Sequence, residues 1–245
     1  QILEYAPSID TMTIKSTNLP GGRYYTDCEE DSYNHKIYCF GGYGSTLLDE
    51  IIEYNPFNNT IRIMQARVPI RTRASLDCVY DRNTRRFYCF GGEPHTNAIF
   101  QYDPISDVTT LQNSVLSAQI AALSCSIINN RGRVYCFGGY GSAIGPLYII
   151  HEYNLSTDSI NVRPITLPMS RYAMSCAPNS NTSTIYCFGG EPFTNMIVEY
   201  SNNNRPTLSP IGNQTIFENS ILTIQLDASD PDNDPLTFDT DASRV

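Results

Sequence analysis

Short apolar runs, each closed by two glycines, recur four times along the chain. They have the form apolar–Tyr–Cys–Phe–Gly–Gly and occupy residues 37–42, 87–92, 134–139 and 185–190. Their cysteines follow one another at intervals of 50, 47 and 51 residues. A β-branched and aromatic run that stops at glycines predicts a strand, and a fixed period near 50 residues indicates a repeat architecture.

The rest of each repeat predicts three further strands. A second cysteine lies eleven residues before the first, within another short strand. Downstream, a third strand ends in an acid or amide followed by tyrosine, at 53–54, 101–102, 152–153 and 199–200. A turn rich in Asn, Asp, Pro and Ser and a fourth strand follow in the first three repeats. Four antiparallel strands in about 50 residues are the pattern of a propeller blade.

The Tyr-x-Phe-Gly-Gly run followed by a Glu-Tyr strand resembles the kelch repeat. An arginine five residues before the earlier cysteine also suits that pattern and is present as Arg23, Arg73 and Arg171, while the third repeat has Ile120 there. The chain departs from the family in its paired cysteines and in its lack of tryptophan. The resemblance implies an all-β fold, a kelch-type β-propeller of four-stranded antiparallel blades over residues 1–205.

The predicted strands do not divide into whole blades. Residues 1–22 match the third and fourth strands of a blade, and three full blades follow. The last repeat, 171–200, has only three strands. Kelch-type rings more often have six or seven blades, so the resemblance implies a larger ring. We therefore expect further blades upstream in a longer protein.

The loops after the Gly-Gly pairs alternate in type. The first and third continue with Tyr-Gly-Ser, the second and fourth with Glu-Pro. Loops at equivalent blade positions lie on one face and often carry function, so we expect four binding-loop residues there. They are Tyr43, Glu93, Tyr140 and Glu191. The alternative is that the tyrosines pack between blades and that the glutamates serve the turn.

The composition changes after Pro206. Residues 206–245 resemble the start of a cadherin-like, dystroglycan-type immunoglobulin-like module, with a predicted strand at 221–226. A complete sandwich of this kind needs about 100 residues, so only its first strands are expected here. Asp230, Asp232 and Asp234 alternate along a turn, and their oxygens suit calcium, the one cofactor that the sequence suggests. The alternative is that aspartates simply favour turns.

The eight cysteines allow many pairings, and the repeat symmetry selects one. The pairs are Cys28–Cys39, Cys78–Cys89, Cys125–Cys136 and Cys176–Cys187. Facing residues on antiparallel strands lie within disulfide range. Paired cysteines at fixed spacing indicate an oxidising compartment, so we expect a secreted, extracellular or cell-surface protein. The alternative is eight free, buried cysteines in a cytosolic propeller.

Four asparagines fit the N-glycosylation pattern, which has meaning in a secreted protein. They are Asn58, Asn154, Asn181 and Asn213. The first three fall in predicted turns, where a glycan stays in solvent. The alternative is that the pattern arises by chance in a chain rich in asparagine.

The overall charge and hydropathy exclude two classes of partner. The net charge is −9 and the pI is near 4.7, which disfavours nucleic acid because binding to phosphates rests on basic patches. No apolar run of about 18 residues is present, so no membrane span is predicted. Protein partners, above all other copies of the chain, and glycans remain.

The sequence favours binding or assembly over catalysis. The three histidines, His35, His95 and His151, fall at unlike blade positions, and no nucleophile, acid–base pair or metal set converges. We expect an extracellular structural or interaction protein, adhering or assembling into a surface coat or fibre through its loops and through strand exchange. A carbohydrate-binding propeller is the alternative. A secreted galactose-oxidase-like enzyme ranks behind both, so the sequence predicts no enzyme.

Overall fold

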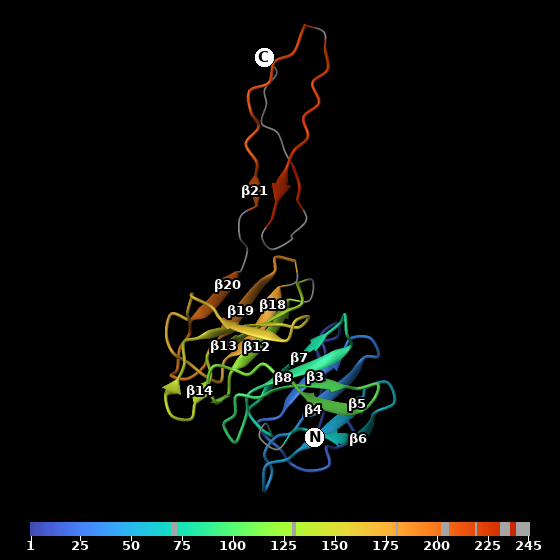
Figure 1. Ribbon diagram of the computed structural model, residues 1–245. Helices are drawn as coiled ribbons and strands as arrows, with labels where there is room; N and C mark the ends of the chain where they lie inside the picture. Colours follow the sequence, from blue (N-terminus) through green and yellow to red (C-terminus); the bar gives the residue numbers. More distant parts are fainter. Residues whose placement is uncertain are drawn as a thin grey trace. The chain divides into compact units, whose positions relative to one another are not determined.

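The computed structural model describes residues 1–69, 73–128, 131–179, 181–201, 206–218, 220–230 and 236–238 (Figure 1). The chain divides into two compact units, Gln1–Glu199 and Tyr200–Val245. Every named element of the described part is a β-strand, and all strand pairs with a described register are antiparallel. The all-β expectation is confirmed.

Four sheets, each a simple antiparallel meander, make up most of the first unit. The first sheet contains β3 (Asp27–Asp31), β4 (Lys36–Phe40), β5 (Glu50–Asn55) and β6 (Thr60–Arg67). The second contains β7 (Asp77–Asp81), β8 (Arg86–Phe90), β9 (Ile99–Asp103) and β10 (Val108–Leu111). The third contains β12 (Ser124–Ile128), β13 (Arg133–Phe137), β16 (Ile150–Asn154) and β17 (Ser159–Val162). The fourth has three strands, β18 (Ser175–Asn179), β19 (Thr184–Phe188) and β20 (Ile197–Ser201).

Two smaller sheets accompany these four. One is the hairpin of β1 (Leu3–Ala6) and β2 (Thr11–Ile14), and the other joins β11 (Ile120–Ala121), β14 (Tyr140–Gly141) and β15 (Gly145–Pro146). Each predicted repeat thus forms one sheet, and no sheet closes on itself.

A disulfide bond joins the first two strands of each of the four main sheets. The two cysteines of a repeat lie directly opposite each other on the first two strands, with Cα atoms 4.0 Å apart in all four pairs. The bonds are Cys28–Cys39, Cys78–Cys89, Cys125–Cys136 and Cys176–Cys187. The predicted pairing is confirmed.

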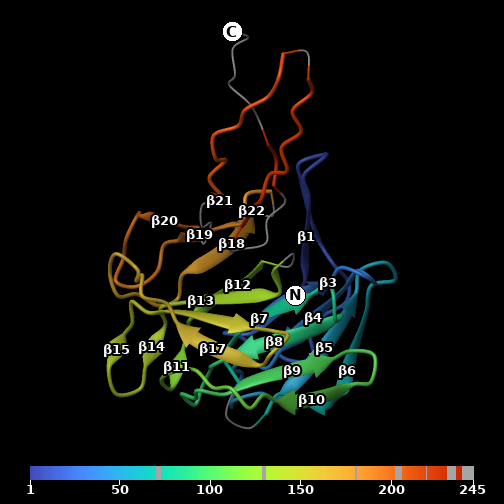
Figure 2. The same cartoon turned by 45° about the horizontal axis from the view of Figure 1, so that its top comes forward.

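The four sheets follow one another in chain order. Their first strands, β3, β7, β12 and β18, contact each other in series, and the second sheet lies between the first and the third (Figure 2). The core lies between neighbouring sheets: Phe40 packs on Phe87 with ring centroids 5.3 Å apart, and Phe90 on Tyr153 at 5.5 Å.

The Gly-Gly pairs hold neighbouring sheets together. The second glycine donates its N–H to a carbonyl of the next repeat: Gly42 to Arg73, Gly92 to Ile120 and Gly139 to Arg171. The first glycine of each pair has a φ near +60°, and at Gly41, Gly91 and Gly138 a Cβ would overlap the same carbonyl oxygen. Only glycine combines this backbone conformation with so close an approach.

Two further sets of hydrogen bonds cross each junction. Residues with positive φ, three before each earlier cysteine, link main chain to main chain: Ser75 N–H to Tyr25, Ala122 to Ser75 and Ala173 to Ala122, at 2.8–3.0 Å. Side chains just before the cysteines accept the next cysteine's N–H: Asp27 from Cys78, Asp77 from Cys125 and Ser124 from Cys176. The junctions are therefore nearly identical copies.

The β1–β2 hairpin occupies the place of a third and fourth strand. In each of the first three sheets a tyrosine hydroxyl donates to an Asx residue five positions on: Tyr54 to Asn59, Tyr102 to Asp107 and Tyr153 to Asp158. Tyr5 and Asp10 repeat this bond at 2.8 Å in the hairpin. Asp107 also accepts from main-chain N–H groups at the end of β6. At the equivalent position Asn59 donates its side-chain amide to Ser16 Oγ, after β2. The hairpin thus repeats contacts that the third and fourth strands make in the first three sheets.

Within the described part of the chain, nothing covers the outward face of the fourth sheet. Phe188 is 46% exposed, whereas Phe40, Phe90 and Phe137 at the equivalent position are 0% exposed. Ile197 is 63% exposed, against at most 2% for its equivalents. Gly189 keeps a φ of +65°, yet a Cβ there would meet nothing within 4 Å. The repeat keeps the junction conformation although no sheet of the described residues packs on this side.

In the second unit the predicted strand at 221–226 does not form. The described pairing is instead β21 (Thr207–Leu208) with β22 (Ala228–Ser229). Ile221 is 94% exposed, and no strand among the described residues supplies the hydrogen bonds or cover that an apolar strand requires. The prediction of a strand at 221–226 is therefore wrong.

Gly189, which has no neighbouring atoms at its Cβ position, is a matched control for Gly138, which lies at a junction. We expect Gly138→Ala to lose about 1–3 kcal/mol more unfolding free energy than Gly189→Ala, because only the former adds an overlap with the Arg171 carbonyl. Both variants share the cost of a left-handed alanine, about 1–2 kcal/mol. Urea unfolding of both variants measures the difference, and equal losses would contradict the junction described above.

Candidate binding site

The residue after each Gly-Gly pair is held by main-chain pairing. It lies opposite a residue of the loop that leads into the first strand of the same sheet. The four pairs are Tyr43 with Tyr24, Glu93 with Ala74, Tyr140 with Ala121, and Glu191 with Tyr172. The repeated loops are thus positioned by β-bridges and by the neighbouring inter-sheet bonds, so their side chains project from a rigid frame.

These loops and the loops that face them line an open cavity of about 780 Å³, which we call the loop cavity. Its lining comes from all four repeats and combines aromatic side chains with small ones. The lining residues are Tyr24, Tyr25, Tyr43, Leu47, Ala74, Ser75, Leu76, Glu93, Pro94, His95, Ala121, Ala122, Leu123, Tyr140, Tyr172 and Ala173. Volumes of roughly 300–1,000 Å³ are typical of small-ligand sites.

Aromatic rings form two groups in the loop cavity. Tyr24 packs on Tyr25 and Tyr43 with centroids 4.8 and 5.2 Å apart. Tyr140 packs on Tyr172 at 5.1 Å and faces His95 at 6.0 Å. Because Tyr24, Tyr25, Tyr43 and Tyr140 are between 37% and 65% exposed, these rings are available for contact.

The charged groups of the loop cavity form one pair. His95 Nδ1 lies 3.0 Å from a Glu93 carboxylate oxygen, and His95 Nε2 is enclosed without a partner in the described part of the chain. Two repeat arginines turn their guanidinium groups to their own sheets, whereas Arg73 pairs with Asp49 of the first repeat at 3.7 Å. Arg23 contacts Gly41 O and Glu50, and Arg171, fully buried, contacts Gly189 O.

Three of the four predicted loop residues therefore lie in one cavity. Glu191 does not line it, although its partner Tyr172 does. Tyr24, Tyr25 and Tyr172 were not among the residues predicted from the sequence. Their place in the repeat could have identified them. Each lies three or four residues before the earlier cysteine of its repeat, in the loop that faces the Gly-Gly loop.

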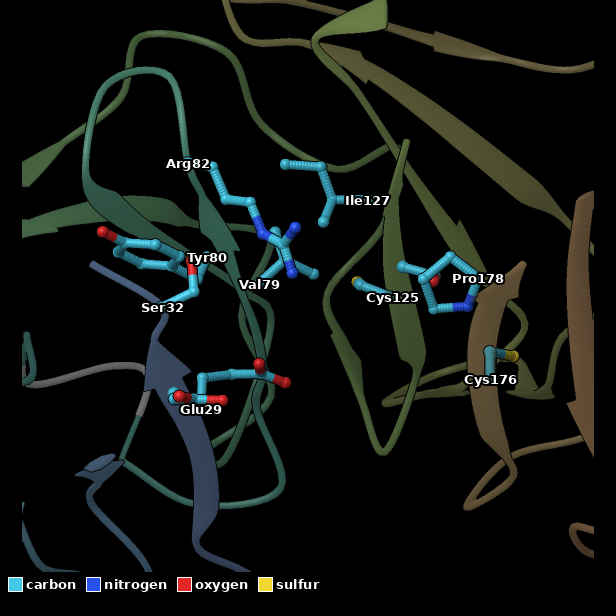
Figure 3. Close-up of a pocket in the computed structure, with 11 residues that line it drawn as sticks. Glu29, Ser32, Val79, Tyr80, Arg82, Cys125, Ile127, Cys176 and Pro178 are labelled. Carbon is cyan, nitrogen blue, oxygen red and sulfur yellow. The ribbon is translucent and has the colours of Figure 1, made fainter. Parts of the chain in front are cut away.

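A second, smaller cavity of about 230 Å³ lies among the first strands of the sheets (Figure 3). Glu29 of β3 and Arg82, just after β7, both project into it, and Cys125 and Cys176 line the opposite side. Burial raises the pKa of Glu29 to about 8, with added repulsion from Asp27 and Glu30. Burial also raises the pKa of Asp27 to about 6.

The three histidines have separate surroundings. His35 pairs with Glu30 on the β3–β4 turn, and His95 lies in the loop cavity. His151 is buried in the third sheet against Ser117 Oγ at 2.8 Å, and burial lowers its pKa to about 4. No group of three or more His, Cys, Asp or Glu side chains that could hold a metal occurs among the described residues.

The predicted calcium and glycan positions stay predictions. Asp232 and Asp234 lie outside the described residues, and Asp230 is half-buried. Asn58, Asn181 and Asn213 are exposed, while Asn154 is half-buried with its amide oxygen bound to Ser156. Over the described ranges, no helix has the length and apolar character needed to cross a membrane.

No family model and no curated protein matches this chain. Among solved structures 204 chains are similar, which marks the fold as a common one. One of them, the structure of YjhT, aligns with a TM-score of 0.62 at 12% sequence identity over 74% of this chain. The alignment spans 62% of the YjhT chain. At this identity the likeness concerns the β-rich fold alone.

The raised pKa of Glu29 predicts a stability that falls with pH. In the unfolded chain this carboxyl ionises near 4.5, whereas the folded chain holds the proton up to about 8. The folded state thus binds more protons in this window, and unfolding free energy decreases as pH rises through it.

We expect Glu29→Gln to be more stable than the wild type at pH 8, by on the order of 1–3 kcal/mol, and to differ little at pH 4. Urea unfolding at both values measures this, with Glu199→Gln, which changes an exposed carboxylate, as the control. A pH dependence that Glu29→Gln leaves unchanged would contradict the assignment.

Proposed function

We propose that residues 1–205 form part of a kelch-type β-propeller that acts as an extracellular binding module, with the loop cavity as its binding site. The repeated Gly-Gly motif, the four-stranded meanders and the serial contact of first strands support the propeller. Neighbouring sheets repeat the same three hydrogen bonds, which is how successive blades would pack. The cadherin-like nature of residues 206–245 is part of the same proposal.

The loop cavity carries the functional proposal. Its lining is drawn from loops of all four repeats and includes four exposed tyrosines, Tyr24, Tyr25, Tyr43 and Tyr140. Tyrosine suits binding surfaces because it offers a large apolar area and a hydroxyl at little entropic cost. Structural packing alone would bury these rings, and Phe40, Phe90 and Phe137 show how this fold does that.

The four disulfides support an extracellular location. Cross-strand bonds in every repeat form and persist in oxidising compartments, and each should stabilise its short hairpin. The same reasoning makes glycans at the exposed sequons part of the proposal.

Binding fits the loop cavity better than catalysis. Glu93 and His95 resemble the base of a catalytic triad, and Ser75 lines the same cavity. His95 Nε2, however, is enclosed and makes no hydrogen bond to that hydroxyl. A nucleophile–base contact is the geometric requirement for such chemistry, so we propose that the protein is not an enzyme.

The cavity proposal can be tested with arrays of extracellular protein domains and glycans. We expect ligands whose binding falls about tenfold or more in the Tyr43→Ala/Tyr140→Ala variant, because two exposed rings of the cavity are lost. Tyr33→Ala is the matched control, since Tyr33 is 64% exposed on the β3–β4 turn and does not line the cavity. Ligands that bind equally to both variants would place the binding site elsewhere.

A specific observation favours assembly as a second function. The outward face of the fourth sheet exposes Phe188 and Ile197 at positions that three other sheets bury against a neighbour. Strand β20 is also an open edge, because its sheet has no fourth strand in the described part of the chain. Such edges favour pairing between chains.

We therefore expect the chain to associate with itself as its concentration rises, and Phe188→Asp to weaken this about tenfold or more by placing a charge in the contact. Sedimentation velocity over a wide concentration range measures the effect. Ile105→Asp, on an exposed turn, is the control because Ile105 is 77% exposed. A wild-type chain that stays monomeric throughout would rule out assembly through this face.

A further inference from the structure

The loop cavity has the electrostatics of a site for an uncharged ligand. Its described lining contains one carboxylate, Glu93, paired with one imidazole, His95, and no lysine or arginine. The nearby Arg23 forms an ion pair with Glu50, with an N–O distance of 2.7 Å, and Arg171 is fully buried. An anionic ligand would lose its hydration without gaining a cation and would meet the Glu93 carboxylate.

The main chain around the cavity is already hydrogen-bonded. Both polar groups of Tyr24 are used by Tyr43, and the N–H and C=O of Ser75 are used by the neighbouring repeats. Ala122 is likewise bonded on both sides. An extended peptide that binds by strand addition needs free main-chain donors and acceptors, so this surface does not suit one.

The side chains instead offer flat rings with polar edges. Tyr24, Tyr25 and Tyr43 form one group, and Tyr140 with Tyr172 forms another. Alanines and Ser75 line the same cavity. A pyranose has the complementary build, since its C–H groups form an apolar face and its hydroxyls project at the edge. The face can stack on a tyrosine ring while hydroxyls bond to phenol oxygens and to Glu93.

We propose that the loop cavity binds a neutral oligosaccharide, with pyranose rings stacked on the two tyrosine groups. A cavity of about 780 Å³ open to solvent has room for a short oligosaccharide. This inference rests on the proposed function, namely that the loop cavity is the binding site, and adds the class of ligand.

The test is titration calorimetry of the intact chain with defined oligosaccharides. The neutral probes are hexasaccharides of glucose, mannose, galactose and N-acetylglucosamine, and the anionic probes are sialylated and uronic-acid oligosaccharides. We expect at least one neutral probe to bind, with affinity falling about tenfold in Tyr140→Ala and in Tyr25→Gly. Tyr25→Gly removes a ring that is 65% exposed and keeps the φ of 54° available.

Two further variants separate a contact with sugar from an effect on folding. Tyr33→Ala, outside the loop cavity, should bind the neutral probe as the wild type does. Glu93→Lys should bind the uronic-acid probe several-fold more tightly than the wild type, because it replaces the repelling carboxylate with a cation. Thermal unfolding confirms that each variant is folded.

The outcomes distinguish the ligand class from the binding site. If no neutral probe binds at millimolar concentration, or if anionic probes bind more tightly to the wild type, the oligosaccharide inference is wrong. If another ligand then binds and Tyr140→Ala weakens it, the cavity remains the binding site. If Tyr140→Ala and Tyr25→Gly leave all binding unchanged, the proposed function itself fails.

Discussion

The close approach of the first three Gly-Gly pairs to the repeat that follows each of them is the constraint on which the structure depends. The second glycine bonds a carbonyl of the neighbouring repeat, and the first has no room for a Cβ beside it. This contact fixes the spacing between sheets, so the aromatic side chains behind it can interlock, as Phe40 does with Phe87. The same contact fixes the loops, because the residue after the glycines must follow the main chain that they set.

Position within the repeat therefore decides whether an aromatic side chain serves the core or the surface. Phe40 lies just before its glycine pair and is completely buried between sheets, whereas Tyr43 lies just after the pair and is 37% exposed in the loop cavity. The disulfide of each sheet lies next to this junction and keeps the two first strands in register. The paired strands and the glycine contacts are the same in successive repeats, and they fix the positions of loops whose residues differ.

Most of the strands and all four disulfide bonds could be predicted from the sequence, because every element of the repeat is local and recurs. The cysteine pairs, for example Cys78–Cys89, follow from symmetry alone. What could not be predicted depends on contacts between repeats. The period alone does not reveal that Ser75 and Ala122 join a ladder of main-chain bonds, or that Tyr172 reaches the cavity of its neighbours. The strand expected at 221–226 failed for a related reason, since an alternating pattern gives no sheet unless a partner strand lies beside it.

The alternation of loop types then makes the cavity asymmetric. A strict repeat would surround it with four equal residues, but it receives two tyrosines, Tyr43 and Tyr140, and one acid, Glu93, from the Gly-Gly loops. The fourth loop contributes through Tyr172 instead of Glu191. Charge is thus confined to the Glu93–His95 side, and aromatic groups lie around the rest. An asymmetric lining can orient an asymmetric ligand, and a chain of near-identical repeats obtains that property only by varying the residues that follow its glycines.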